Sequence, residues 1–336
     1  MLYTGGTIGM MRDEKTGSLR PFNFQHLLKQ IPELNQFECE IDTFSLRNPV
    51  DSSDIKPDHW VSLARRITQG YEYYDGFVIL HGSDTMAFSA SALSFLLENL
   101  AKPVIFTGSQ LPIGITRSDA RENLMTAIEI ALARRADNLA MIPEVAIYFE
   151  NHLLRGNRTH KNSTEDFEAF QSLNYPLLAE VGVHIKYHEA YINVPAKDAL
   201  IQHEELNGDI SVLTLFPGIG RSYVEAVTGD PEMRGLILRS FGSGNIPTDA
   251  WLRDLLEGVL DRDIPVVNIS QCSGGSVEQG KYEASKALLD IGVLGGGDMS
   301  FEAALTKMMY LLGHGFSGKE FERLFLTNLR GELSVD

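Results

Sequence analysis

Short apolar runs that end in glycine, serine or threonine recur through the first half of the chain and constrain its fold more than any other feature. FVIL at 77–80 leads into HGSDTM, and VIF at 104–106 leads into TGSQLP. Each run precedes a stretch with helical character, at 87–100 and at 118–135. Continuous apolar strands that alternate with helices are typical of βαβ units. The sequence therefore predicts an α/β fold built on a parallel sheet.

A second series of strands and helices follows a break in this pattern. Between 186 and 208 the sequence has mixed polarity and no sustained period, and we interpret it as a linker or connecting hairpin. The later apolar runs lie at 211–220, 235–245 and 265–275. The segment at 300–315 predicts a helix with one apolar face. Two such series within 336 residues favour two domains over one.

The charge balance argues against several classes of partner. Lys and Arg number 29 against 45 Asp and Glu, which gives a formal charge of -16. Such an acidic surface repels polyanions, so we expect no nucleic-acid partner and no anionic-membrane partner. No secretory n-region is present, and no uninterrupted apolar run approaches the ~20 residues of a membrane-spanning helix. We expect a cytoplasmic protein.

Two further expectations concern the cysteines and the first strand. Cys39 and Cys272 match no zinc or redox spacing, so we expect free, buried thiols in a reducing compartment. The first apolar run has only about three residues before its glycines, whereas most strands have ~5–6. A few further residues upstream of Met1 would fit this short strand.

Hydroxyl side chains gather where the predicted strands end. The strand-end residues are Thr4, Thr7, Ser83, Asp84, Thr85, Thr107 and Ser109. In open α/β sheets, ligands bind beyond the carboxyl ends of the strands, so these side chains form a candidate site. Serine and threonine also cap helices, and for any single hydroxyl, Ser83 included, capping is the simpler interpretation.

Spacing excludes several familiar kinds of site. TGGTIG lacks the G-x-G-x-x-G order, and no phosphate-binding G-x-x-x-x-G-K-[ST], H-E-x-x-H or G-x-S-x-G motif occurs. His184 and His188 lie four apart in a strand-like stretch, so we do not expect a shared metal face. A threonine nucleophile remains, and it needs a base that takes its proton. A desolvated lysine could serve. Lys161 is the candidate, with Asp84 as its partner, although spacing alone favours a solvated loop lysine.

Five motifs together resemble one known family. In chain order they are YTGGTIG, DGFVILHGSDTM, PVIFTGSQLP, RGNRTHK and ILRSFGSGN. The chain resembles the bacterial-type L-asparaginases, specifically their cytoplasmic type I branch, over essentially its whole length. The resemblance implies a larger N-terminal α/β domain at 1–185 and a smaller C-terminal α/β domain at 209–336, joined by a linker at 186–208. It also implies hydrolysis of L-asparagine to L-aspartate and ammonia without a cofactor.

The resemblance assigns roles to particular residues. Thr7 matches the threonine that attacks the side-chain amide and forms a β-aspartyl enzyme. Ser83 matches a second hydroxyl that works with Lys161 and Asp84. The implied substrate-binding residues are Gly6, Asp51, Ser52, Ser53, Gly82, Ser83 and Asp84. Asp84 would face the substrate ammonium, and the glycines would let backbone and substrate approach closely.

The chain departs from the family pattern at several positions. The second hydroxyl is usually threonine, but here it is Ser83, and the loop after the first motif lacks the usual tyrosine. Tyr282 matches a tyrosine that some members bring from the other domain or a neighbouring subunit. Arg239 and Cys272 fit an effector site for asparagine, whereas His160 replaces a small hydroxyl residue there. We therefore expect hyperbolic saturation, and the family implies a homodimer or a dimer-of-dimers tetramer.

Alternative functions remain open at this stage. A glutaminase-asparaginase of broad specificity shares the same motifs, so L-glutamine is a second possible substrate. An ammonia-generating subunit that acts on charged tRNA is disfavoured by the acidic charge. A non-catalytic amino-acid sensor belongs to a different class, and binding alone would not need Thr7, Ser83, Asp84 and Lys161 together.

Overall fold

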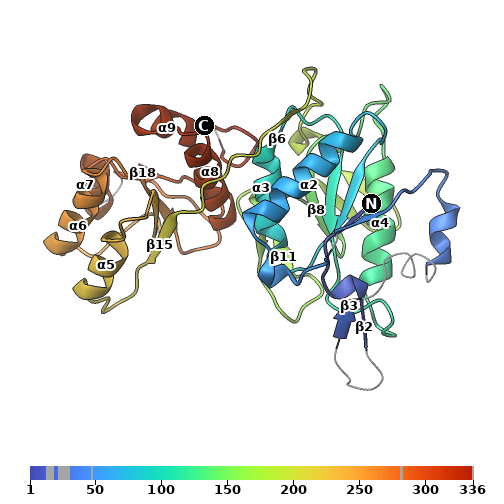
Figure 1. The fold of residues 1–336 in the computed structure, drawn as a ribbon, viewed down its shortest axis with the longest axis horizontal. Coiled ribbons are helices and arrows are strands. Elements are labelled where there is room, and N and C mark those ends of the chain that lie inside the picture. Colours follow the sequence, from blue (N-terminus) through green and yellow to red (C-terminus); the bar gives the residue numbers. More distant parts are fainter. Residues whose placement is uncertain (13–18, 22–30, 47, 281–282, 335–336) are drawn as a thin grey trace. The chain divides into compact units, whose positions relative to one another are not determined.

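A computed structural model describes residues 1–12, 19–21, 31–46, 48–280 and 283–334 (Figure 1). Its contacts divide the chain into two compact units, Met1–His203 and Glu204–Asp336. Unit 1 contains helices and a mixed sheet whose central strands are parallel, and unit 2 contains helices and a parallel sheet, so the predicted α/β class, with a larger N-terminal and a smaller C-terminal part, is confirmed. The assignment of 186–208 as a linker stays a prediction.

The sheet of unit 1 has eight strands in the order β13-β12-β9-β8-β7-β5-β1-β4. Their bounds are β1 (Leu2–Tyr3), β4 (Phe44–Ser45), β5 (Phe77–Leu80), β7 (Val104–Thr107), β8 (Val145–Phe149), β9 (His152–Arg155), β12 (Ala179–Val181) and β13 (Ile185–Tyr187). Pairing is parallel from β4 to β8 and antiparallel from β8 to β13. Strands β5, β7 and β8 are buried at every residue, as expected for parallel strands that are covered on both faces.

The register aligns the carboxyl ends of three neighbouring strands. Tyr3 at the end of β1 lies opposite Leu80 at the end of β5, and Leu80 lies opposite Thr107 at the end of β7. Strand β1 pairs with β4 on one side and with β5 on the other, so strand order reverses there. Ligands bind at such reversal points in open α/β sheets. The segments that leave these strands therefore begin at one edge of the sheet.

Among the described residues of unit 1, three helices pack on the sheet or on one another. They are α2 (Pro57–Gly70), α3 (Met86–Leu96) and α4 (Ala120–Leu132). Helix α4 packs Leu124 and Ala127 into a core with the sheet residues Val78 and Tyr148. Helix α3 also contacts β8, and α2 packs on α3. In Figure 1, α3 and α4 lie on opposite sides of β8, so helices cover both faces of the sheet.

The helix predicted at 87–100 ends earlier than expected. Leu97 has left the helical region (φ -115, ψ 86) and begins β6 (Leu97–Glu98). Asn99 then adopts the left-handed backbone (φ 61), which no right-handed helix can include. The chain therefore turns here to pair β6 with β14 (Ile201–Gln202), in antiparallel register.

Several short elements of unit 1 have no counterpart in the sequence analysis. Two antiparallel ribbons pair β2 (Met10–Arg12) with β3 (Leu19–Pro21), and β10 (His160–Lys161) with β11 (Phe170–Gln171). The 3₁₀ turns are η1 (Thr7–Gly9), η2 (Pro32–Gln36), η3 (Ser52–Asp54), η4 (Gly156–Arg158) and η5 (Glu189–Tyr191). Elements of two to five residues are too short to show a hydrophobic period, so sequence patterning does not reveal them.

Unit 2 is built on a four-stranded parallel sheet in the order β15-β16-β17-β18. Its strands are β15 (Ile210–Thr214), β16 (Gly235–Ser240), β17 (Val266–Ser270) and β18 (Leu294–Gly295). Its helices are α5 (Arg221–Thr228), α6 (Ala250–Leu260), α7 (Glu283–Asp290), α8 (Phe301–Gly313) and α9 (Gly318–Phe325). A core of aliphatic side chains from α5, α6 and the strands lies within this unit, so it buries an apolar centre of its own.

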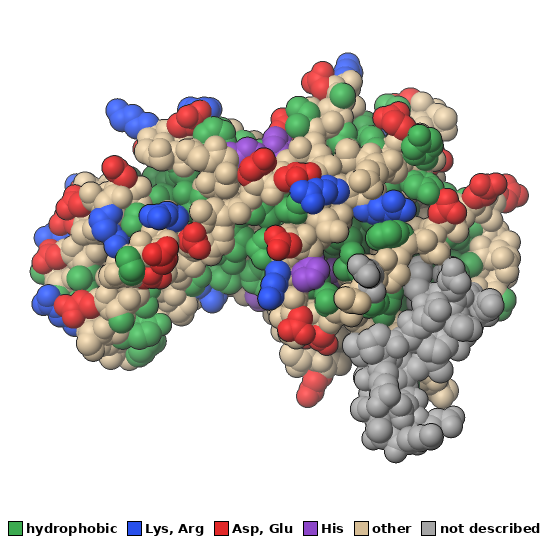
Figure 2. Space-filling model, in the orientation of Figure 1, with side chains coloured by type: hydrophobic (Ala, Val, Ile, Leu, Met, Phe, Trp, Pro, Cys, Tyr) green, Lys and Arg blue, Asp and Glu red, His purple; other side chains and the backbone are tan. Residues whose placement is uncertain are grey.

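The surface corrects one expectation about the cysteines. Cys39 is half-buried and Cys272 is exposed, so the prediction of two buried thiols is wrong. Figure 2 shows acidic and basic side chains interspersed on the visible face of each unit rather than a broad basic area. In the described part of the chain, no helix combines the length and apolar character that crossing a bilayer requires.

Candidate active site

Two glycines bring the first two strand ends into direct contact. Gly6 has a positive φ of +89, and a Cβ built there would lie 2.5 Å from both Cα and N of Gly82. A Cβ on Gly82 would lie 2.6 Å from Oγ of Ser52. Only glycine fits at Gly6, because the colliding atoms there are backbone and the positive φ disfavours a side chain. At Gly82 the added Cβ would also lie 2.7 Å from Cβ of the buried Ser52. Thr7 directly follows Gly6, and Ser83 directly follows Gly82, so the two residues that carry the hydroxyls begin where the two backbones touch.

Lys161 is hydrogen-bonded to the Ser83 hydroxyl. Its Nζ donates to Oγ of Ser83 at 2.9 Å and to Oδ1 of Asp84 at 2.5 Å. The lysine side chain is 14% exposed, and that of Asp84 is 63% exposed. The β10–β11 ribbon holds the lysine, with Lys161 opposite Phe170. The interpretation of Lys161 as a solvated loop residue is therefore wrong.

Ser83 is also not a helix cap. The cap position of α3 is Thr85, and no side chain caps the helix there. The Ser83 hydroxyl instead accepts from Lys161 and donates to Oε1 of Gln110 at 3.4 Å. The amide oxygen of Gln110 orients the hydroxyl, and Lys161 is the group with which the hydroxyl can exchange a proton, which is the arrangement that acid–base chemistry needs.

The loop at 51–53 packs against the same strand end through its middle residue. Ser52 is buried, and its carbonyl accepts from Oγ1 of Thr85 at 2.7 Å. Asp51 and Ser53 are exposed, and Oδ1 of Asp51 accepts from N and Oγ of Ser53 at 2.9 and 2.8 Å. These hydrogen bonds lower the pKa of Asp51 and keep it ionised. The loop thus presents a carboxylate and a hydroxyl beside the Ser52–Gly82 contact.

The third strand end supplies Gln110, which the sequence analysis did not select. Its Nε2 donates to the carbonyl of Asp166 at 2.9 Å, and its Oε1 accepts from Ser83. The buried carboxylate of Asp119 accepts from N of Gln110 at 2.9 Å and from N of Leu111 at 3.1 Å. The position of Gln110 directly after TGS at a strand end was the available signal.

Other predicted hydroxyls at the strand ends bond to backbone. Oγ1 of Thr4 donates to the carbonyl of Leu80 at 3.0 Å, and Oγ of Ser109 donates to that of Leu111 at 2.7 Å. These two hydroxyls stabilise the local backbone, so the group that the structure brings together is smaller than the sequence cluster.

The residues predicted for an effector site lie in different units. In unit 2, Arg239 follows the buried part of β16, and its guanidinium carbon lies 4.8 Å from the centroid of the Phe301 ring. Cys272 follows β17 and donates its N–H to Oγ of Ser270 at 3.0 Å. His160 belongs to β10 in unit 1. Tyr282 lies outside the described residues.

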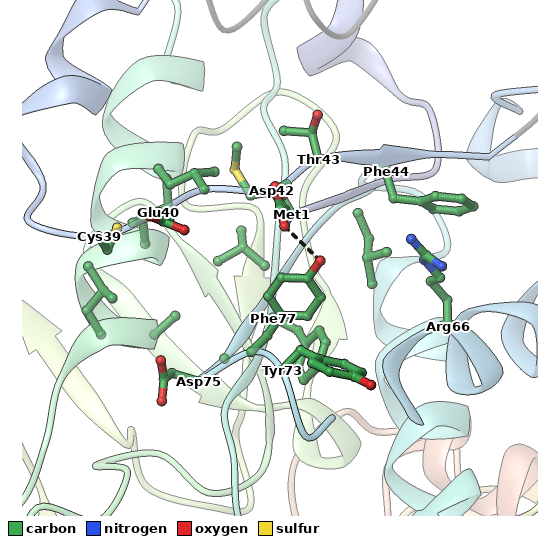
Figure 3. A pocket seen from close by; sticks show the side chains of 18 of the residues that line it. Met1, Cys39, Glu40, Asp42, Thr43, Phe44, Arg66, Tyr73, Asp75 and Phe77 are labelled. Carbon is green, nitrogen blue, oxygen red and sulfur yellow. Dashed lines mark hydrogen bonds between the residues drawn. The ribbon is translucent and has the colours of Figure 1, made fainter. Parts of the chain in front are cut away.

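A cavity of about 720 Å³ lies elsewhere in unit 1 (Figure 3). Its lining includes Leu2 and Phe77, which are the first residues of β1 and β5. At its wall, the Tyr74 hydroxyl donates to Oδ2 of Asp42 at 2.8 Å. The candidate residues follow the last residues of these strands, so the cavity lies at the opposite edge of the sheet and contains none of them. Among the described residues, no three His, Cys, Asp or Glu side chains are placed to hold a metal ion.

Fold and site together define an α/β protein with hydroxyl, lysine and carboxylate groups gathered where parallel strands end. Residues 1–193 match the family model for the asparaginase N-terminal domain, and residues 209–325 match that for the glutaminase/asparaginase C-terminal domain. The chain belongs to the asparaginase family, and the resemblance seen in the motifs is confirmed.

Individual relatives extend over nearly the whole chain. L-asparaginase 1 of Escherichia coli (strain K12) is 44% identical over 340 residues, which cover 99% of this chain and 97% of that protein. The crystal structure of L-asparaginase I from Vibrio cholerae is 38% identical, with a TM-score of 0.89 and coverage of 99% and 98%. The thermostable L-asparaginase from Thermococcus kodakarensis is 32% identical, with a TM-score of 0.90 and coverage of 100% and 98%.

Proposed function

We propose that this chain hydrolyses the side-chain amide of L-asparagine to L-aspartate and ammonia. The observation that carries the proposal is the hydrogen-bonded group of Lys161, Ser83 and Asp84, which adjoins the Gly6–Gly82 contact that precedes Thr7. Relatives named as L-asparaginases match the chain end to end, which supports the same reaction.

In the proposed cycle Thr7 is the nucleophile. Its Oγ1 forms a bond to the amide carbon, and the proton it loses passes through the Ser83 hydroxyl to Lys161, which takes part in this step as the neutral amine. The tetrahedral intermediate collapses, the carbon–nitrogen bond breaks, and the same proton leaves with ammonia. Water then attacks the β-aspartyl ester, gives its proton back to Thr7, and releases L-aspartate. Donors at the strand ends stabilise the oxyanion in both steps.

Charge complementarity explains how the zwitterionic substrate is recognised. The exposed carboxylate of Asp84 faces the α-ammonium, and the ionised Asp51 adds a second negative charge. To receive the α-carboxylate, the Ser53 hydroxyl turns away from Asp51 and donates to the substrate instead. A glutaminase-asparaginase would use the same groups for a substrate that is one methylene longer.

Steady-state ammonia release from L-asparagine and from L-glutamine tests this proposal. We expect Thr7→Ala to lose several orders of magnitude in kcat, because covalent catalysis has lost its attacking atom. Lys161→Met should act similarly. Thr4→Val is the matched control, since it removes a hydroxyl that bonds only to the Leu80 carbonyl. Calorimetric binding of L-asparagine by wild type without ammonia release would instead establish a sensor.

We further propose a cytoplasmic homodimer or dimer-of-dimers tetramer, with Tyr282 contributed across an interface and asparagine saturation that is hyperbolic. The large imidazole of His160 would fill the effector pocket and so remove cooperativity. Light scattering at micromolar concentration, coupled to an activity assay, tests the assembly, and an active monomer would contradict it. A Hill coefficient clearly above one that Arg239→Ala abolishes would refute the proposed absence of activation.

A further inference from the structure

His81 is a buried histidine directly before Gly82, and the proposed cycle gives it no chemical role. Its ring lies at the inner end of a hydrogen-bonded chain of buried side chains. Nε1 of Trp60 donates to Oγ of Ser89 at 2.8 Å, and that Oγ lies 2.9 Å from Nε2 of His81. On its other side, Nδ1 of His81 lies 2.7 Å from the carbonyl oxygen of Gly82.

The chemistry of the two end groups fixes the direction of every bond in this chain. The Trp60 indole can only donate, so the Ser89 hydroxyl accepts from it and keeps its own proton available for another acceptor. The Gly82 carbonyl can only accept, so Nδ1 of His81 carries the ring proton. In a neutral ring Nε2 is then bare, so the Ser89 hydroxyl donates to it, and the ring is in its Nδ1–H tautomer with both nitrogens satisfied.

Burial keeps the ring in this state. Desolvation lowers the pKa of His81 to about 4, so the ring stays neutral at physiological pH. The ring also packs edge-on against Phe106, with centroids 5.7 Å apart. A neutral, enclosed imidazole whose two nitrogens are both engaged is suited to holding a neighbour in place, not to exchanging protons with substrate.

The neighbour that it holds is the peptide between Gly82 and Ser83. Glycine allows this peptide to rotate more freely than any other residue would. The bond from His81 fixes the carbonyl of this trans peptide, so the Ser83 N–H points in the opposite direction within the peptide plane. The same restraint limits the backbone from which Oγ of Ser83 reaches Nζ of Lys161.

We propose that His81, held in its Nδ1–H tautomer by Ser89 and Trp60, is a positioning residue that aligns the Ser83 hydroxyl with Lys161. This inference rests on the proposed amidase function. It gives the site an inner support, by which we mean the hydrogen-bonded side chains of Trp60, Ser89 and His81. These hydrogen-bonded side chains act through the Gly82 carbonyl. Loss of the hydrogen bond from His81 to this carbonyl should therefore lower kcat and leave KM nearly unchanged.

Two substitutions at His81 separate positioning from simple packing. The side-chain amide nitrogen of His81→Asn takes about the place of Nδ1 and can still donate to the Gly82 carbonyl. In His81→Gln the amide reaches the place of Nε2 and leaves no donor at the place of Nδ1, which bonds to the Gly82 carbonyl in wild type. We expect His81→Asn to keep kcat for L-asparagine within about threefold of wild type, and His81→Gln to lose about tenfold or more. Equal kcat values for the folded variants would overturn the inference.

Ser89→Ala with Ser91→Ala as its control provides a second test that does not alter the ring. Both hydroxyls are buried in α3, but Oγ of Ser91 bonds to the Gly156 carbonyl. Without the Ser89 hydroxyl, Nε2 of the ring loses its donor, and only the Gly82 carbonyl still favours the Nδ1–H tautomer. We expect kcat to fall about tenfold in Ser89→Ala and to stay at the wild-type value in Ser91→Ala. If His81→Gln does not fold, this pair decides, and equal activity of the two serine variants refutes the role.

Nitrogen NMR of histidine-labelled protein gives a readout that does not depend on activity. The His81 signal, assigned by its loss in His81→Asn, should show a proton on Nδ1 and a bare Nε2 at neutral pH. A proton on Nε2 would overturn the inference whatever the enzyme does. A wild type that releases no ammonia from L-asparagine would overturn the proposed function instead, so the two failures are distinguishable.

Discussion

The buried Lys307–Glu332 pair of unit 2 permits a quantitative prediction about stability. Both side chains are 0% exposed, and Nζ of Lys307 lies 2.5 Å from Oε1 of Glu332. The ammonium also donates to the carbonyls of Phe325 and Thr327, at 2.8 and 2.6 Å. The carboxylate in turn accepts from two backbone N–H groups at 329–330. Lys307 belongs to α8 and Glu332 follows α9, so the ion pair holds the segment after α9 against α8.

Glu332→Gln should destabilise the protein by about 3–5 kcal/mol, which is the usual cost of removing one partner from a buried ion pair. Glutamine also replaces one carboxylate oxygen of Glu332 with an NH2 group. Each of the two oxygens accepts from an N–H donor, so the NH2 group would face a donor at either position. Burial lowers the pKa of Lys307, and the Glu332 charge opposes this shift. Removing Glu332 lowers that pKa further. The unfolded state then binds more protons than the folded state at alkaline pH, so the deficit should shrink as pH rises towards the ordinary lysine pKa.

Urea unfolding monitored by circular dichroism measures this cost. Glu320→Gln is the matched control, because Glu320 is an exposed carboxylate on α9, and it should change the unfolding free energy by less than about 0.5 kcal/mol. Each single variant, Lys307→Met or Glu332→Gln, leaves one buried charge without its partner, whereas the double variant leaves none. The double variant should therefore lose clearly less unfolding free energy than the sum of the two single variants. A Glu332→Gln protein within about 1 kcal/mol of wild type, or strict additivity, would refute the reasoning.

Three further predictions concern the site. Ser83→Thr should change kcat by no more than about tenfold. Ser83→Ala should lower kcat about a hundredfold and leave Tm unchanged, because the hydroxyl caps no helix. A lower Tm with full turnover in Ser83→Ala would contradict this. Gly6→Ala should lose activity and at least about 1–3 kcal/mol, since its Cβ would meet Gly82 backbone; wild-type melting and turnover would argue otherwise. Because the folded pKa of His81 is about 4 and the unfolded value 6.5, the unfolded state binds more protons between them, and stability should fall by about 3 kcal/mol as pH drops from 6.5 to 4. His81→Asn should lack this component in urea titrations, and an unchanged pH slope would be evidence against it.

The fold could be predicted where the physics is local. FVIL and VIFT are continuous apolar runs that need cover on both faces, so the parallel sheet followed from them. The end of α3 could not be predicted, because Leu96 and Leu97 are equally apolar and the break depends on pairing with β14, more than 100 residues away.

The site was predictable only in part, since its contacts are distant in sequence. Lys161 lies 77 residues beyond Asp84, and its burial depends on a two-residue strand that shows no pattern of its own. Spacing alone favoured a solvated lysine, and only the family resemblance placed it beside Ser83. The inner support was not visible for the same reason: Trp60 lies 29 residues before Ser89, and no motif links either to His81.

The covalent intermediate on Thr7 is the central claim, and acid quenching tests it most directly. Wild-type protein is mixed with L-asparagine, quenched within the first turnover, digested and examined by mass spectrometry. We expect the peptide that contains Thr7 to gain the mass of one aspartyl group through an ester, and the same peptide from Thr7→Ala to stay unmodified. Full ammonia release by Thr7→Ala, or an aspartyl ester on Ser83 instead, would contradict the account.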